Sequence, residues 1–287
     1  MIRYSFKSFF GKIVCSGRFL VIILFFAFVT GFESHTFMFN LKTCGENICP
    51  LEIIPYFMTV KRGMFLYYIF FILLVCIYPM YDGCMMEVAR MGKNKWFCQQ
   101  LLYVVFTSVL QSVVFSVSYI LMLIPVSVWK NSWSDCLVKA TEEQGFIDGI
   151  MQIIFVHKIY EWLNPVAAYV ICLMLNILCS IFLGMVMIVL GICFKKVIAI
   201  CVAGVAVFYF GFVENGIYMG TGVVGIIYDF FIEHLYPIRH AALGYIEGYG
   251  DLAEAVVYFA VGICIIWIVG RHAVSGQDFA AGTVRGE

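Results

Sequence analysis

The sequence predicts an all-helical integral membrane protein, and three observations carry that prediction. Of the 287 residues, 63% are hydrophobic and only 13% are charged, and the mean hydropathy is +0.97. A soluble domain is nearer half apolar and a quarter charged, so its surface could not cover this much apolar side chain. Six apolar segments have the length of a membrane span, and basic residues gather in alternate segments between them. Soluble enzymes and nucleic-acid-binding proteins are therefore excluded.

The apolar segments define the expected spans, since a spanning helix needs about 20 predominantly apolar residues. Asn164 before Pro165 predicts a capped start for the fourth span. Asp251, with Glu254 three residues later, is typical of a capping box at the start of the sixth. The polar segments are too short to build a separate core, so residues 1–287 are expected to form a single transmembrane domain. The six spans are expected at about 17–38, 64–81, 97–125, 165–190, 197–213 and 252–270.

Two further segments predict helices that do not cross the bilayer. Residues 2–14 place apolar side chains on one helical face and basic ones on the other, which predicts an interfacial elbow helix. No small-residue cleavage site follows the first apolar run, so we expect a retained span rather than a removed leader. Residues 214–250 combine apolar runs with seven glycines. This stretch predicts broken, re-entrant helices on the outer side, before the last span.

The basic residues orient the chain. If residues 1–18, 82–96, 191–197 and 271–287 lie inside, they hold 11 of the 18 basic side chains and four acidic ones. The outer segments would then hold seven basic and fourteen acidic side chains over nearly twice the length. Because positive charge marks cytoplasmic segments, both termini are expected to be cytoplasmic.

Uncharged polar residues occur within the spans and have two interpretations. Hydrogen bonding between helices explains them better than contact with a substrate does. These residues are Gln99, Gln100, Gln111, Ser112, Asn176 and Ser180. Of the twelve cysteines, Cys44 and Cys49 are close together in a polar outer loop, where a disulfide and two free thiols are both compatible with the spacing. No spacing of Cys and His indicates a metal site.

Catalytic motifs are mostly missing from the sequence. It has no GxxxxGK[ST] sequence for ATP phosphates, no HExxH and no GxSxG. One alternative is an intramembrane aspartyl protease, because Asp229 follows Tyr228 and Asp251 ends a GxGD sequence. Two such carboxyl groups would have to face each other within the membrane to share a proton. Asp251 instead stands at a helix start, where capping explains it.

The order of these pieces resembles the membrane subunit of an ABC transporter, in the exporter-type (ABC-2) permease family. The likeness lies in the amphipathic elbow, in RMGKNKW before a long third span, and in the run from Asn164 to Lys196 with its basic turn. It continues in LYPIRHAALGYIEG and in a last span that ends with a basic stretch before Asp278-Phe279. The resemblance covers nearly the whole length, but by organisation rather than by a diagnostic motif.

The resemblance implies a transport subunit without catalysis of its own, in a bacterial plasma membrane. Two permease subunits, identical or homologous, would form a dimer around a pathway for an amphiphilic cargo such as a peptide, lipid or drug. ATP and magnesium would bind cytoplasmic ATPase subunits. The ATPase-coupling surface would be Met85, Met86, Glu87, Arg90, Lys93 and Lys95. The outer gate would include Gly216, Gly220, Asp229 and Glu233. A membrane anchor or immunity-type protein that transports nothing remains the non-enzymatic alternative.

Overall fold

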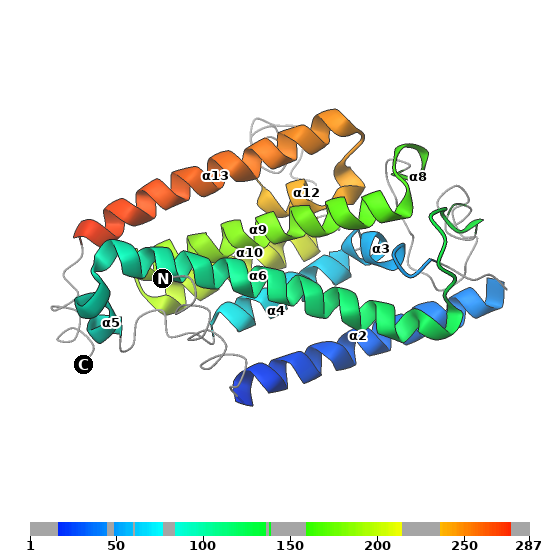
Figure 1. Cartoon of the computed structure of the whole chain (residues 1–287), viewed down its shortest axis with the longest axis horizontal. Coiled ribbons are helices and arrows are strands. Elements are labelled where there is room, and N and C mark those ends of the chain that lie inside the picture. Colours follow the sequence, from blue (N-terminus) through cyan, green and yellow to red (C-terminus); the bar gives the residue numbers. More distant parts are fainter. Residues whose placement is uncertain are drawn as a thin grey trace.

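The computed structural model describes residues 17–44, 49–59, 61–76, 84–135, 138, 159–213 and 236–276. Within these ranges the chain is predominantly helical and contains no β-strand. The expected interfacial helix at 2–14 lies outside them, as does most of the expected re-entrant region, from 214 to 235. The elements form an elongated bundle of long helices (Figure 1).

The expected spans correspond to apolar helices. Three helices are long and apolar enough to cross a membrane: α6 (Lys93–Leu123), α9 (Pro165–Cys193) and α13 (Tyr249–Gly276). Shorter apolar stretches lie in α2 (Gly17–Cys44), α4 (Lys61–Val75) and α10 (Lys196–Val213). The prediction of an all-helical membrane protein is therefore confirmed at the level of its class.

Several helix boundaries differ from the expected spans. Helix α2 continues six residues past the expected end at 38, and α13 begins before and ends after 252–270. Both differences arise because hydropathy marks only the apolar part of a helix, whereas the backbone stays helical in its polar flanks. Helix α4 ends at Val75 instead of 81. The expected span overlooked Pro79, which lacks an N–H and disfavours helix in the residue before it.

The long helices alternate in direction along the chain (Figure 1). Helices α2, α6 and α10 run one way, and α4, α9 and α13 run the other. We call the end of the bundle where α6 and α10 begin and α4, α9 and α13 end the α5 end, after the short helix α5 (Cys84–Met91) found there. The opposite end is the α8 end, after α8 (Ile159–Trp162).

Helix α9 forms the centre of the bundle, where it contacts α13, α10, α6 and α4. Its start is capped as predicted, because Asn164 Oδ1 accepts a hydrogen bond from the backbone N–H of Ala167 at 2.8 Å. The start of α13 differs from the prediction. Asp251 lies inside the first turn, and its carboxylate accepts from the backbone N–H of Glu247 at 2.8 Å. Asp251 therefore stabilises the helix start by reaching back into the preceding loop.

Candidate functional site

A second elbow, distinct from the helix expected at 2–14, joins α5 to α6 at the α5 end of the bundle. We call it the α5 elbow. Helix α5 ends at Met91, and Gly92 follows with a backbone φ of +81° and ψ of 151°. Only glycine adopts this region readily, because it has no Cβ. The Gly92 N–H closes α5 by donating to the Val88 carbonyl at 2.8 Å, and the Gly92 carbonyl accepts from the Trp96 N–H at 3.1 Å, within the first turn of α6. The chain therefore changes direction at one residue while both helices keep their hydrogen bonds.

Buried side chains fix this elbow to the bundle. Val88 of α5 is buried, and Trp96 and Phe97 are almost completely buried in the first turn of α6. Phe97 lies so close to α13 that a Cβ at Gly270 would be 2.4 Å from its ring. Lys93 Nζ donates to the Ser275 carbonyl near the end of α13, at 3.2 Å. The elbow is therefore joined to two of the long helices, α6 and α13.

The residues expected to couple to an ATPase all lie in this elbow. Arg90 and Lys95 are exposed, and Lys93 is half-buried beside Ser275. Helix α5 also contains Met85, Met86 and Glu87. For these three residues the structure describes the backbone and not the side chains. Four of the six residues thus belong to a short helix of eight residues and two to the start of α6, whereas the coupling role stays a prediction.

Neighbouring basic residues make the α5 end positively charged. Exposed or half-buried Lys195 and Lys196 form the turn from α9 to α10, and Arg271 lies in the last turns of α13. Lys196 Nζ also donates to the Cys76 carbonyl beyond α4, at 3.3 Å. At the α8 end acidic residues predominate instead. They are Glu52, Asp135, Glu161, Glu247, Asp251 and Glu254.

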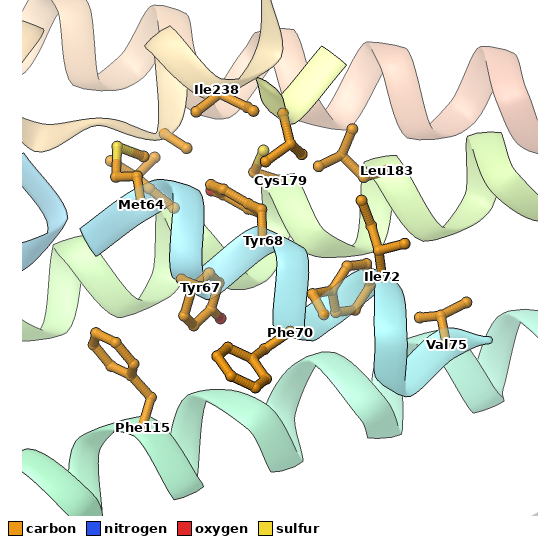
Figure 2. Packing of buried hydrophobic residues seen from close by; sticks show 14 of the residues in the cluster. Met64, Tyr67, Tyr68, Phe70, Ile72, Val75, Phe115, Cys179, Leu183 and Ile238 are labelled. Carbon is orange, nitrogen blue, oxygen red and sulfur yellow. The ribbon is translucent and has the colours of Figure 1, made fainter. Parts of the chain in front are cut away.

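The polar residues within the spans join helices to one another. Tyr67 and Tyr68 of α4 lie edge to face with their ring centres 5.2 Å apart, and their hydroxyls reach two different helices (Figure 2). The Tyr67 hydroxyl hydrogen-bonds Ser112 Oγ of α6 at 2.7 Å, and the Tyr68 hydroxyl donates to Asn176 Oδ1 of α9 at 2.7 Å. Gln111 Nε2 donates to the Tyr67 carbonyl. Because all are at most 2% exposed, these bonds tie helices together and line no open pathway.

Gln99, Gln100 and Ser180 are also buried, as the sequence predicted for residues within spans. Both polar atoms of the Gln100 amide lack a hydrogen-bond partner among the described residues. The geometry therefore accounts for Gln111, Ser112 and Asn176 through interhelical bonds and gives no such account of Gln100.

A buried carboxyl group at the α8 end escaped the sequence analysis. Glu52, before α3 (Ile53–Thr59), is fully buried and accepts from Ser134 Oγ at 2.7 Å and from the Cys49 N–H at 3.4 Å. Burial raises the pKa of Glu52, and the hydrogen bonds from Ser134 oppose that shift only in part. A lone carboxyl inside the apolar sequence CPLEII was the signal that could have revealed it.

Other expected site residues are not brought into a site. Gly216, Gly220, Asp229 and Glu233 of the expected outer gate lie outside the described residues. Of the two cysteines in the possible disulfide, Cys49 is buried and Cys44 ends α2 with its side chain undescribed, so that pairing stays a prediction. Asp251 is exposed in the first turn of α13, where it caps the helix start, and Asp229, its partner in the protease alternative, lies outside the described residues.

Metal chemistry has no candidate centre in the described ranges, where no group of three or more His, Cys, Asp or Glu could hold an ion. A small polar pocket lies beside the start of α13. No family model, curated protein or solved structure matches this chain.

Proposed function

We propose that this chain is the membrane subunit of an ATP-driven exporter of the ABC-2 type. It crosses the bilayer six times, with both termini in the cytoplasm, and works with a separate ATPase and a second permease subunit. The α5 elbow carries the proposal. It consists of a short helix at the end of the bundle, which exposes Arg90, and of the start of α6, where Lys93 donates to Ser275 of α13.

The alternation of helix directions supports six crossings. Helix α2 begins and α13 ends towards the same end of the bundle. The apolar core of a bilayer is about 30 Å thick, and a helix rises 1.5 Å per residue. Helices α6, α9 and α13 span that thickness alone, whereas α4 would need its flanking residues or a thinner bilayer. The positive charge at the α5 end supports placing that end in the cytoplasm.

The elbow supplies a physical route for coupling. A partner that displaces α5 would move the rigid start of α6, because Trp96 and Phe97 are packed in the bundle. The same displacement would reach α13 through the Lys93–Ser275 hydrogen bond and through the contact of Phe97 with Gly270. Closure of the ATPases would in this way reorient helices on two sides of α9.

The character of the long helices supports an amphiphilic cargo. Helices α6 and α13 carry charged residues only within about two turns of their ends. Helix α9 carries no charged residue. A pathway for a small ion is normally lined by charged rings or by ordered carbonyl groups. A surface of apolar and uncharged polar side chains suits a molecule that brings its own apolar part.

Co-purification of the native complex tests the coupling surface. We expect an ATPase chain carrying GxxxxGK[ST] to co-purify with the wild type and to be lost from the double variant Glu87→Ala/Arg90→Ala. The matched control is Lys130→Ala/Asp135→Ala, which removes one exposed base and one exposed acid at the α8 end. Loss in the control as well, or retention in both, would contradict the assignment of the elbow.

Cysteine labelling tests the orientation separately. A cysteine replacing Arg90 should be protected from a membrane-impermeant thiol reagent in intact cells and should react after lysis. A cysteine replacing Lys130 should react in intact cells, relative to the parent chain. The reverse pattern would show that the α5 end faces outward and would exclude coupling to a cytoplasmic ATPase.

A further inference from the structure

A polar pocket lies beside the start of α13. Helix α12 (Pro237–Ala241), the short helix η4 (Leu243–Tyr245) and the first turns of α13 surround it. Its volume is about 230 Å³. Pockets for drug-sized ligands are usually about 300–1,000 Å³, so this one suits a smaller polar group. Its lining residues are Arg239, His240, Tyr245, Ile246, Asp251, Glu254 and Ala255.

The pocket presents opposite charges from two different elements. Arg239 of α12 holds its guanidinium 5.2 Å from the centre of the Tyr245 ring. Asp251 and Glu254 lie one turn apart on α13, and both are exposed. The His240 ring is stacked on Tyr258 of α13 at 4.2 Å, which holds α12 against α13. A ligand with one anionic and one cationic group could therefore meet a complementary charge at each.

The length of α13 places this pocket at the depth of lipid headgroups. Glu254 and Arg271 are 17 residues apart, about 26 Å along a helix, and no charged residue lies between them. That distance approaches the thickness of the apolar layer. Aromatic rings mark both levels, as they do at membrane interfaces. Trp162 packs edge-on against Tyr249 at one level, and Arg271 lies over the Trp267 ring at the other.

Below the pocket, α13 exposes a continuous apolar surface towards the lipid. Only 11% of the residues in its most apolar stretch are buried. A molecule held in the pocket by its polar part could lay an apolar chain against this surface. The large exposed side chains are Val257, Val261, Ile265, Trp267, Ile268 and Val269.

We propose that the pocket binds the headgroup of a zwitterionic phospholipid whose acyl chains lie along α13. The phosphate meets Arg239, and the ammonium group meets Asp251 and Glu254. A charge-assisted contact at each end explains why a group with both charges is preferred over a purely anionic headgroup. The inference requires only a membrane protein, so it stands or falls independently of the exporter proposal.

Lipid binding to the purified, delipidated full chain in detergent tests the inference. Native mass spectrometry would compare phosphatidylethanolamine with phosphatidylglycerol, which has the phosphate but no ammonium group. We expect the wild type to retain phosphatidylethanolamine about tenfold more tightly, and glycerophosphoethanolamine, the headgroup without chains, to bind far more weakly. Equal retention of the two lipids would overturn a zwitterion site. Equal binding of the soluble headgroup would indicate a site for a free ligand instead of a lipid.

Two variants assign the charges. Arg239→Gln should weaken both lipids about tenfold, because it removes the phosphate contact. Glu254→Gln should reduce the preference for phosphatidylethanolamine without weakening phosphatidylglycerol, because Asp251 alone then meets the ammonium group. Their matched controls are Arg271→Gln, at the other end of α13, and Asp135→Asn, outside the pocket.

Unchanged binding by both pocket variants would overturn the inference, as would an equal loss in the controls. If Arg239→Gln does not yield a monodisperse protein, Glu254→Gln decides alone, because its exposed side chain is not needed to pack α13.

Discussion

Helices α9 and α13 have nearly the same length and hydropathy, yet they occupy opposite environments. In α9, 56% of the residues in the most apolar stretch are buried in the bundle, against 11% in α13. The difference lies in which side chains meet a neighbour. Helix α9 presents small and polar residues such as Cys172, Asn176 and Gly184 to the helices around it. Apolarity therefore identifies a membrane helix, whereas small and polar residues locate it inside the bundle.

The largest expected difference in the free energy of unfolding is between two isoleucine variants, one in each helix. Ile188 of α9 is 2% exposed, and Ile265 of α13 is 56% exposed. Ile188→Ala should lower the free energy of unfolding by about 3 kcal/mol, because it leaves a cavity in the bundle. Ile265→Ala should change it by less than about 0.5 kcal/mol, since detergent or lipid replaces the lost contact. Denaturant unfolding in mixed micelles measures both. Equal costs would mean that α13 is packed against protein on its exposed face.

Glycines provide the second comparison. A Cβ at Gly184 would be 2.5 Å from Val104 Cγ1 and 3.1 Å from the Phe71 ring, whereas a Cβ at Gly204 of α10 would meet nothing within 4 Å. Gly184→Ala should therefore cost about 2 kcal/mol through overpacking. Gly204→Ala should be neutral or stabilise the chain by about 0.5 kcal/mol, through its greater helix propensity. The same unfolding measurement applies. If Gly184→Ala leaves the free energy of unfolding unchanged, α6 and α9 must separate easily.

Interhelical hydrogen bonds should contribute less than packing. Tyr68→Phe removes the donor to Asn176 Oδ1 and should cost about 1 kcal/mol, within the range found for such bonds in membrane proteins. Tyr249→Phe changes a ring that is 67% exposed on α13 and should have no measurable effect on the melting temperature. A loss well above 2 kcal/mol at Tyr68 would indicate a larger role for the polar groups inside the bundle.

The smallest expected effect is on the pH dependence of the free energy of unfolding, and it compares a buried carboxyl group with an exposed one. Because burial raises the pKa of Glu52 above its ordinary 4.5, the folded state holds a proton there that the unfolded state releases. Between these two pKa values the free energy of unfolding falls as the pH rises, and this loss is complete above the folded-state pKa. Glu52→Gln should flatten that part of the stability profile, and Glu254→Gln on exposed α13 serves as the control. An unchanged slope in Glu52→Gln would contradict the buried environment.

The sequence predicted the apolar helices and the cap at Asn164, because each depends on neighbours within a few residues. It did not predict the pairing of Glu52 with Ser134, which are 82 positions apart. Nor did it place Arg239 beside Asp251 and Glu254, since α12 and α13 meet only once the loop between them has folded. Hydropathy likewise gave no sign that α9 is central and α13 peripheral.

Gly92 makes the direction of α5 depend on a single missing carbon atom. With a φ of +81° and a ψ of 151°, any residue other than glycine would strain the backbone here. A Cβ at this position would nevertheless meet no atom within 4 Å. Replacing Gly92 would thus penalise the angle between the two helices while sparing every contact inside the bundle. A chain altered at this position would keep the packing of its long helices and would present α5 at a different angle to the end of the bundle.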